Sequence, residues 1–149
     1  MATEFRRGAL LLDLSYCAQL SWALLQRELE AAGVKAELIG LLTQIRLLEP
    51  VTPGVLTART GLAPATLYDY VSRLVDEGLV ERQPNPSDGR SYLISTTSAG
   101  LERVHASAPA VGRAVRQILE HLDRPHEDAE RFMFELRQAL EQAQQPALT

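Results

Sequence analysis

The sequence is poor in the features that mark secreted and membrane proteins. Its single cysteine, Cys17, excludes an intramolecular disulfide and a cysteine-rich metal site. No window approaches eighteen uninterrupted apolar residues, so we expect no membrane-spanning segment. The apolar run after Arg7 is interrupted by Asp13 and lacks a small-residue cleavage site, which argues against a signal peptide. These absences predict a cytoplasmic protein that has no membrane partner.

Basic residues are outnumbered by acidic ones. The 15 lysines and arginines face 19 aspartates and glutamates, giving a net charge of −4, whereas domains that bind nucleic acid are typically basic. Residues 52–99 hold four basic and five acidic residues, so this segment is no exception. Binding to DNA would therefore depend on where a few arginines lie, and a dimer would double their number. The charge balance is the main argument against a DNA-binding function.

Signatures of catalysis are also absent from the sequence. It contains no nucleophile elbow, no glycine-rich phosphate loop and no paired-carboxylate site. The three histidines are His105, His121 and His126, and their spacing does not suggest a metal cluster. We therefore expect neither an enzyme nor a bound cofactor or metal.

The middle of the chain predicts two short helices around a tight turn. Thr52 is a good N-cap and Pro53 a good first residue for the first helix. Gly61 can take the positive φ that ends this helix. A second helix is expected from Pro64 and is closed by Gly78. Its core-facing residues recur at helical spacing and are Leu67, Val71, Leu74 and Val75.

A β-hairpin is expected directly after these helices. Leu79 to Arg82 and Tyr92 to Ser95 can form two strands, joined by a loop rich in turn residues. Two helices around a glycine turn, followed by a hairpin, predict a winged helix-turn-helix. In this architecture the second helix can enter the major groove of DNA.

Long amphipathic helices are expected on both sides of this segment. Residues 5–48 and 98–145 would form helices for dimerisation and the core, and residues 51–97 the winged helix-turn-helix, within one domain of residues 1–149. Pro109 should kink the helix that starts near residue 98. The apolar surface exceeds what a small winged domain needs, so we expect an intertwined homodimer. A heptad seam runs through Leu101, Val104, Ala108, Val111, Val115, Ile118 and Leu122.

The winged segment resembles the MarR family of bacterial transcription regulators. The features that carry the resemblance are Leu79-Val80-Glu81-Arg82, Asp88-Gly89-Arg90, Thr97 to Gly100, and the order Thr66-Leu67, Val71 and Arg73-Leu74. The resemblance implies a mainly α fold with a small β-hairpin wing and a homodimer that binds a pseudo-palindromic operator in double-stranded DNA. It also implies release by a small, often aromatic effector, held in a cleft that Tyr16 and Trp22 could line.

The exposed face of the second helix is the first candidate for DNA contact. Hydroxyl groups on this face can bond phosphates or base edges, and Arg73 can pair with a phosphate or a guanine. Asp69 would repel phosphate, although a carboxylate can accept from cytosine N4. The simpler interpretation is an ordinary solvated helix face. The candidate residues are Ala65, Thr66, Tyr68, Asp69, Ser72 and Arg73.

The hairpin tip is the second candidate. By the family resemblance, Arg90 would reach the minor groove or its phosphates, and Asp88 would orient it. Gly89 stands where relatives often have a second arginine, so this wing carries less charge. The alternative is a turn in which Asp88 and Arg90 form only an ion pair. Arg59 and Arg82 are further candidates for phosphate contact.

Two other interpretations stay open. Some relatives sense peroxides through a lone cysteine in the first helix, but no basic residue adjoins Cys17 and its position on the apolar side predicts a buried structural residue. The acidic balance and Asp69 also allow a winged-helix module for protein interaction or dimerisation, with little affinity for DNA.

Overall fold

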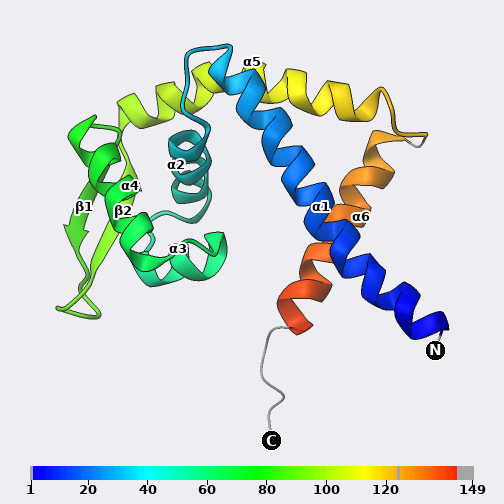
Figure 1. Ribbon diagram of the computed structural model, residues 1–149. Coiled ribbons are helices and arrows are strands. Elements are labelled where there is room, and N and C mark those ends of the chain that lie inside the picture. The colour runs from blue at the N-terminus through cyan, green and yellow to red at the C-terminus, as the bar shows by residue number, and fades with distance from the viewer. Residues whose placement is uncertain (1, 124, 144–149) are drawn as a thin grey trace, which may run out of the picture. The chain divides into compact units, whose positions relative to one another are not determined.

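The computed structural model describes residues 2–123 and 125–143, with side chains from Ala9 onward (Figure 1). These residues form six helices and one two-stranded antiparallel sheet, which confirms a mainly α fold with a β-hairpin. In chain order the elements are α1 (Ala2–Glu30), α2 (Ala36–Leu48), α3 (Pro53–Thr60), α4 (Pro64–Asp76), β1 (Val80–Pro84), β2 (Tyr92–Thr96), α5 (Ser98–Leu119) and α6 (His126–Ala143).

The chain divides into two compact units, the first ending at Ala114 and the second beginning at Val115. Helix α5 crosses this boundary, and α6 belongs to the second unit. The assignment of the whole chain to a single domain stays a prediction. No helix within the described residues is long and apolar enough to cross a membrane.

Helix α2 is the central element of the first unit. It contacts α1, α3, α4 and β2, and Figure 1 shows α3, α4 and the hairpin gathered around it. Its apolar residues face this core, as their helical spacing predicts. Because α4 packs on α2 along one face, its other face is held outward. The fully buried side chains of this core include Leu42, Ile45, Leu56, Leu67, Leu74 and Ile94.

The ends of α3 and α4 have the predicted caps. The Thr52 hydroxyl accepts a hydrogen bond from the backbone N–H of Val55 (3.4 Å) at the start of α3. Gly61 ends α3 with a φ of 68°, and Gly78 follows α4 with a φ of 69°. Both values lie in the left-handed region that side chains disfavour. These two glycines therefore fix how α4 leaves α3 and enters the hairpin.

The hairpin is longer than the sequence indicated at its far end. Strands β1 and β2 pair from Val80↔Thr96 to Pro84↔Tyr92. Leu79 was expected to begin the first strand, but it closes the end of α4 instead. The reason is that its N–H donates to the carbonyl oxygen of Leu74 (2.8 Å).

The start of α5 explains the Thr-x-x-Gly pattern. The Thr97 hydroxyl donates to the carbonyl oxygen of Gly78 (2.7 Å) and accepts from the N–H of Gly100 (3.1 Å). A Cβ at Gly100 would collide with the backbone carbonyl of Leu79. Only glycine therefore allows this approach. The helix continues through Pro109 and ends at Leu119, so Leu122, the last residue of the predicted heptad seam, lies beyond it.

The buried side of α5 differs from the predicted heptad seam. Small residues are buried along α5, namely Gly100, Ser107, Ala110 and Ala114. Of the seam residues, Leu101, Val104 and Val111 are half-buried, whereas Ala108, Val115, Ile118 and Leu122 are exposed. The predicted seam therefore lies largely beside the face that packs within the chain.

Much of α1 and α6 is exposed and apolar. Helix α1 meets α2 where Trp22 lies beside Gly40 and where Gln26 donates to Glu37. The exposed large apolar residues before Trp22 are Leu10, Leu11, Leu12, Tyr16 and Leu20. Cys17 is also exposed, so the expectation that it is buried is wrong for the single chain. On α6 the exposed set includes Phe132, Met133, Phe134 and Leu140. The predicted polar tail after residue 143 lies outside the described residues.

Candidate nucleic-acid interface

Helix α4 is divided lengthwise into an apolar and a polar face. Leu67, Val71 and Leu74 are buried against the core, as predicted. The predicted contact residues lie on the other side: Ala65, Tyr68, Asp69 and Arg73 are exposed, and Thr66 and Ser72 are half-buried. The first unit thus presents hydroxyl groups, one carboxylate and one guanidinium on one face of α4, while the opposite face of the helix packs against the core. Such a face can bond phosphates and base edges.

Arg82 of β1 is engaged by residues of α4 and β2. Its guanidinium carbon lies 5.4 Å from the ring centroid of Tyr68 and 5.0 Å from that of Tyr92, both within range of a cation–π contact. Its Nη2 donates to the Ser72 hydroxyl (3.0 Å). The sequence interpretation treated Arg82 only as a phosphate contact and missed these partners. The available signal was that Val80 and Arg82, two residues apart, share the core-facing side of β1.

The hairpin tip is shaped by side chains that accept from its backbone. Asp88 Oδ1 accepts from the N–H of Arg90, and Asn85 Oδ1 accepts from the N–H of Ser87, each at 3.0 Å. Both are the short-range bonds by which Asp and Asn stabilise turns. Asp88 therefore orders the backbone at Arg90, whose side chain is exposed. This arrangement leaves both interpretations of the wing in place.

The two remaining arginines of the segment are also exposed. Arg59 lies in the last turn of α3, and Arg73 in the last turn of α4. All four arginines of residues 52–99 thus belong to the helix-turn-helix and its wing. Their role in binding DNA stays a prediction.

Glu49 anchors the hairpin to the end of α2. Its Oε2 accepts from the N–H (2.5 Å) and the hydroxyl (2.6 Å) of Thr96, and its Oε1 accepts from Arg46 (2.7 Å). Burial raises the pKa of the Glu49 carboxyl, but the hydrogen bonds from Thr96 and the charge of Arg46 outweigh this effect and lower it below its ordinary value. No pattern in the sequence indicates this role of Glu49.

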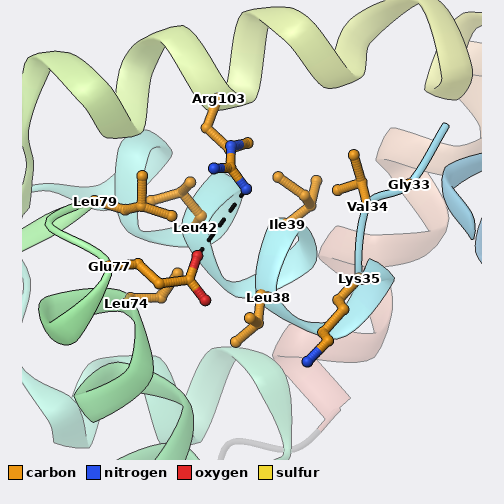
Figure 2. Close-up of a pocket in the computed structure, with 10 residues that line it drawn as sticks. All are labelled: Gly33, Val34, Lys35, Leu38, Ile39, Leu42, Leu74, Glu77, Leu79 and Arg103. Atoms are coloured by element: carbon orange, nitrogen blue, oxygen red, sulfur yellow. Dashed lines mark ion pairs between the residues drawn. The ribbon is translucent and has the colours of Figure 1, made fainter.

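A small cavity lies behind α4, among α2, the end of α4 and the start of α5 (Figure 2). It has a volume of about 150 Å³, and its apolar walls include Leu38, Ile39 and Leu74. Figure 2 shows Arg103 reaching from α5 toward Glu77, and these groups form a long ion pair of 4.0 Å. Tyr16 and Trp22, the predicted ligand residues, do not line this cavity.

The described side chains contain no group of three or more His, Cys, Asp or Glu residues that could hold a metal ion. Their most distinctive arrangement is a helix with an outward polar face, preceded by a glycine turn and followed by a two-stranded wing. This arrangement defines a winged helix-turn-helix protein.

Comparison with known proteins identifies the family. The model of the MarR family matches residues 32–91. The chain is 31% identical over 96 residues to the multiple antibiotic resistance protein MarR of Escherichia coli, covering 64% of this chain and 67% of that protein. The chain therefore belongs to the MarR family of transcription regulators.

Other relatives agree with this assignment. An HTH-type transcriptional regulator of Mycobacterium tuberculosis is 34% identical over 90 residues, which span 60% of this chain and 63% of that protein. The crystal structure of E. coli MarR in its apo form has a TM-score of 0.69 at 25% identity, covering 89% of this chain and 95% of that one. A mutant E. coli MarR complexed with operator DNA has a TM-score of 0.70 at 26% identity, covering 89% and 94%.

Proposed function

We propose that this protein binds a pseudo-palindromic operator in double-stranded DNA as a homodimer and so regulates transcription. The observation that carries the proposal is the outward polar face of α4 beside a wing whose tip bears an exposed Arg90. The mutant MarR solved with operator DNA, which shares the fold over most of this chain, supports it. Recognition from α4 would read base edges in the major groove, and Arg90 would contact the backbone or minor groove.

The exposed apolar residues of α1 and α6 support the homodimer. Leu12 of α1 is 73% exposed and Met133 of α6 is 60% exposed, and each lies among further exposed apolar side chains. Clustered apolar surface of this kind marks a protein interface more often than a solvated face. A two-fold dimer would place two copies of α4 about one DNA turn apart, which requires a near-palindromic site.

The acidic balance sets the electrostatic character of this binding. The winged segment supplies four arginines to each chain, and a dimer would supply eight. Each phosphate contact contributes a slope of about −0.9 to the dependence of log affinity on log salt. Eight such contacts would give a slope no steeper than about −7, and hydrogen bonds by the hydroxyl groups of α4 would add affinity that salt changes less. Activity on DNA would place the protein in the cytoplasm.

Release by a small aromatic ligand is the regulatory part of the proposal. A ring carbon of Trp22 lies 3.5 Å from where a Cβ at Gly40 would stand, an ordinary van der Waals distance, so the indole lies directly beside α2. A ligand bound there can release DNA only by its higher affinity for the arrangement that does not fit the operator. Because Trp22 is the only tryptophan, titration with aromatic acids and phenols should change its fluorescence. If a ligand releases the DNA completely but leaves the fluorescence of Trp22 unchanged, the ligand binds elsewhere.

A gel shift of the purified protein at low salt tests the central proposal. DNA from upstream of its own coding sequence is the first probe, followed by random-sequence selection. A discrete complex that resists nonspecific competitor and weakens as salt rises is the expected result. Failure of a folded dimer to enrich any sequence would overturn the proposal and favour the alternative, a winged-helix module for protein interaction.

A further inference from the structure

We propose that Arg82 is a positioning residue, which fixes the hydroxyl groups of α4 to the base of the wing and does not itself neutralise a phosphate. The inference rests on the proposed function and deepens it. It changes the role of one of the four arginines of residues 52–99 from phosphate contact to positioning. It also explains how a winged helix-turn-helix with few basic residues can present an ordered exposed face on α4.

The direction of Arg82 follows from the register of the hairpin. Arg82 pairs with Ile94, and residues directly opposite in an antiparallel pair point to the same side of the sheet. Ile94 is fully buried, and Val80, two residues before Arg82, is also buried. Arg82 therefore points toward α4 at the position where the apolar core ends. Glu81 and Gln83, which pair with each other at 2.9 Å, occupy the alternate side.

The contacts of Arg82 suit a guanidinium and no other cation. Its carbon lies within 5.4 Å of the ring of Tyr68 on α4 and within 5.0 Å of the ring of Tyr92 on β2. At the same time one nitrogen donates to Ser72 at 3.0 Å. A planar group can stack on rings and donate from its edge together, whereas an ammonium group has no flat face for stacking. Arg82 thus joins α4 to both strands of the hairpin.

These contacts assign a direction to the Ser72 hydroxyl. Its oxygen accepts from Arg82, so its own hydrogen is directed to donate. The available partners on DNA are acceptors, namely a phosphate oxygen, a purine N7, a guanine O6 or a thymine O4. The ring of Tyr68, an exposed residue of α4, is held by its cation–π contact with Arg82. The result is one oriented hydroxyl group, that of Ser72, and one positioned phenol ring beside the wing.

The decisive variant is Arg82→Lys, which keeps the charge and removes the planar stack. If Arg82 positions α4 and the wing, affinity for the selected operator should fall about tenfold while the salt slope is unchanged. If Arg82 contacts a phosphate, Arg82→Lys should bind within about twofold of the native protein. In that case Arg82→Ala should reduce the slope of log affinity against log salt by about 0.9 per chain. That second pattern would overturn the proposal.

Tyr92→Leu supplies an independent variant, because Tyr92 touches Arg82 but is not among the residues expected to contact DNA. It should weaken operator binding about threefold to tenfold, again with an unchanged salt slope. Gln83→Ala, in β1 and on the opposite side of the hairpin from Arg82 and Tyr92, is the matched control and should bind as the native protein does. Native affinity for Tyr92→Leu would show that the stack positions nothing.

Thermal unfolding without DNA separates failure of this inference from failure of the proposed function. Arg82→Lys and Tyr92→Leu should each lower the melting temperature by about 2–4 °C, and the double variant should fall by less than their sum. If the two decreases in melting temperature add in the double variant, Arg82 and Tyr92 do not interact, and the proposal is overturned. If the native protein enriches no DNA sequence, the proposed function and the DNA role of Arg82 are both overturned. Melting-temperature changes that are less than additive would then show that the stack of Arg82 on Tyr92 exists without a role in DNA binding.

Discussion

The helix-turn-helix lobe, formed by α2, α3, α4 and the hairpin, and the helices α1 and α6 differ in where their apolar side chains lie. In the lobe, Leu42, Ile45 and Ile94 are fully buried within one chain. In α1 before Trp22, and in α6, large apolar residues such as Leu12 and Phe134 are exposed. The lobe therefore completes its own core, whereas these helices carry apolar surface that the chain itself does not cover. The proposed homodimer accounts for this difference, because a second copy of the chain would cover the apolar surface of α1 and α6.

Truncation of the lobe core should have the largest effect. Leu42→Ala removes a side chain with 0% exposure from the central helix and should lower the free energy of unfolding by about 2–5 kcal/mol. Leu47→Ala, on the same helix at 69% exposure, is the matched control and should change it by less than about 0.5 kcal/mol. Chemical denaturation of both variants measures the contrast. Equal losses would mean that the lobe does not hold its core alone.

The close approach between α5 and the start of the hairpin should be nearly as sensitive. Gly100→Ala places a Cβ against the carbonyl of Leu79 and should destabilise the protein by about 1–3 kcal/mol. Gly89→Ala is the control, because a Cβ at Gly89 meets no atom within 4 Å. Denaturation curves should separate the two variants by their midpoints. A tolerated Gly100→Ala would show that α5 can move away from Leu79 without loss.

A charge on the uncovered face of α1 should break association and spare the lobe. Leu12→Glu should weaken the dimer at least about tenfold, since burying a leucine contributes roughly 1.5–3 kcal/mol. Sedimentation velocity over a range of concentrations measures the change, and Leu47→Glu is the exposed control on the lobe. A native protein that sediments as a monomer at micromolar concentration would contradict the dimer altogether.

The link between α2 and the wing should give a smaller, pH-dependent effect. Because the folded-state pKa of Glu49 is lowered, its contribution to stability is present above the ordinary value of 4.5 and is lost as pH falls through the folded-state pKa. Glu49→Gln should therefore cost about 1 kcal/mol at pH 7 and progressively less in acid. Thermal melts at pH 7 and at successively lower pH, run on both proteins, test this. A constant difference at all pH values would show that the charge of Glu49 is not involved.

The sequence could predict those features that depend on residues close together along the chain. The cap at Thr52, the left-handed turns at Gly61 and Gly78 and the two faces of α4 depend on local geometry and spacing, and the structure has all of them. The partners of Arg82 could not be predicted in the same way, because they depend on how α4 packs against the hairpin.

The same reasoning explains the misjudged positions. Glu49 accepts from Thr96, 47 residues away, and no local pattern announces such a bond. Cys17 lies on an apolar side of α1, yet it is exposed within the single chain. Periodicity shows which side of a helix is apolar, but it does not show whether that side is covered by the same chain.

The hydroxyl of Thr97 has a mechanical consequence. It bonds the carbonyl of Gly78, just beyond α4, and the N–H of Gly100, in the first turn of α5. At Gly100 the backbone of α5 lies so close to Leu79 that a side chain there would collide with the Leu79 carbonyl, so the two helix ends are in close contact. One side chain therefore ties the first turn of α5 directly to the end of α4, the helix that would face DNA.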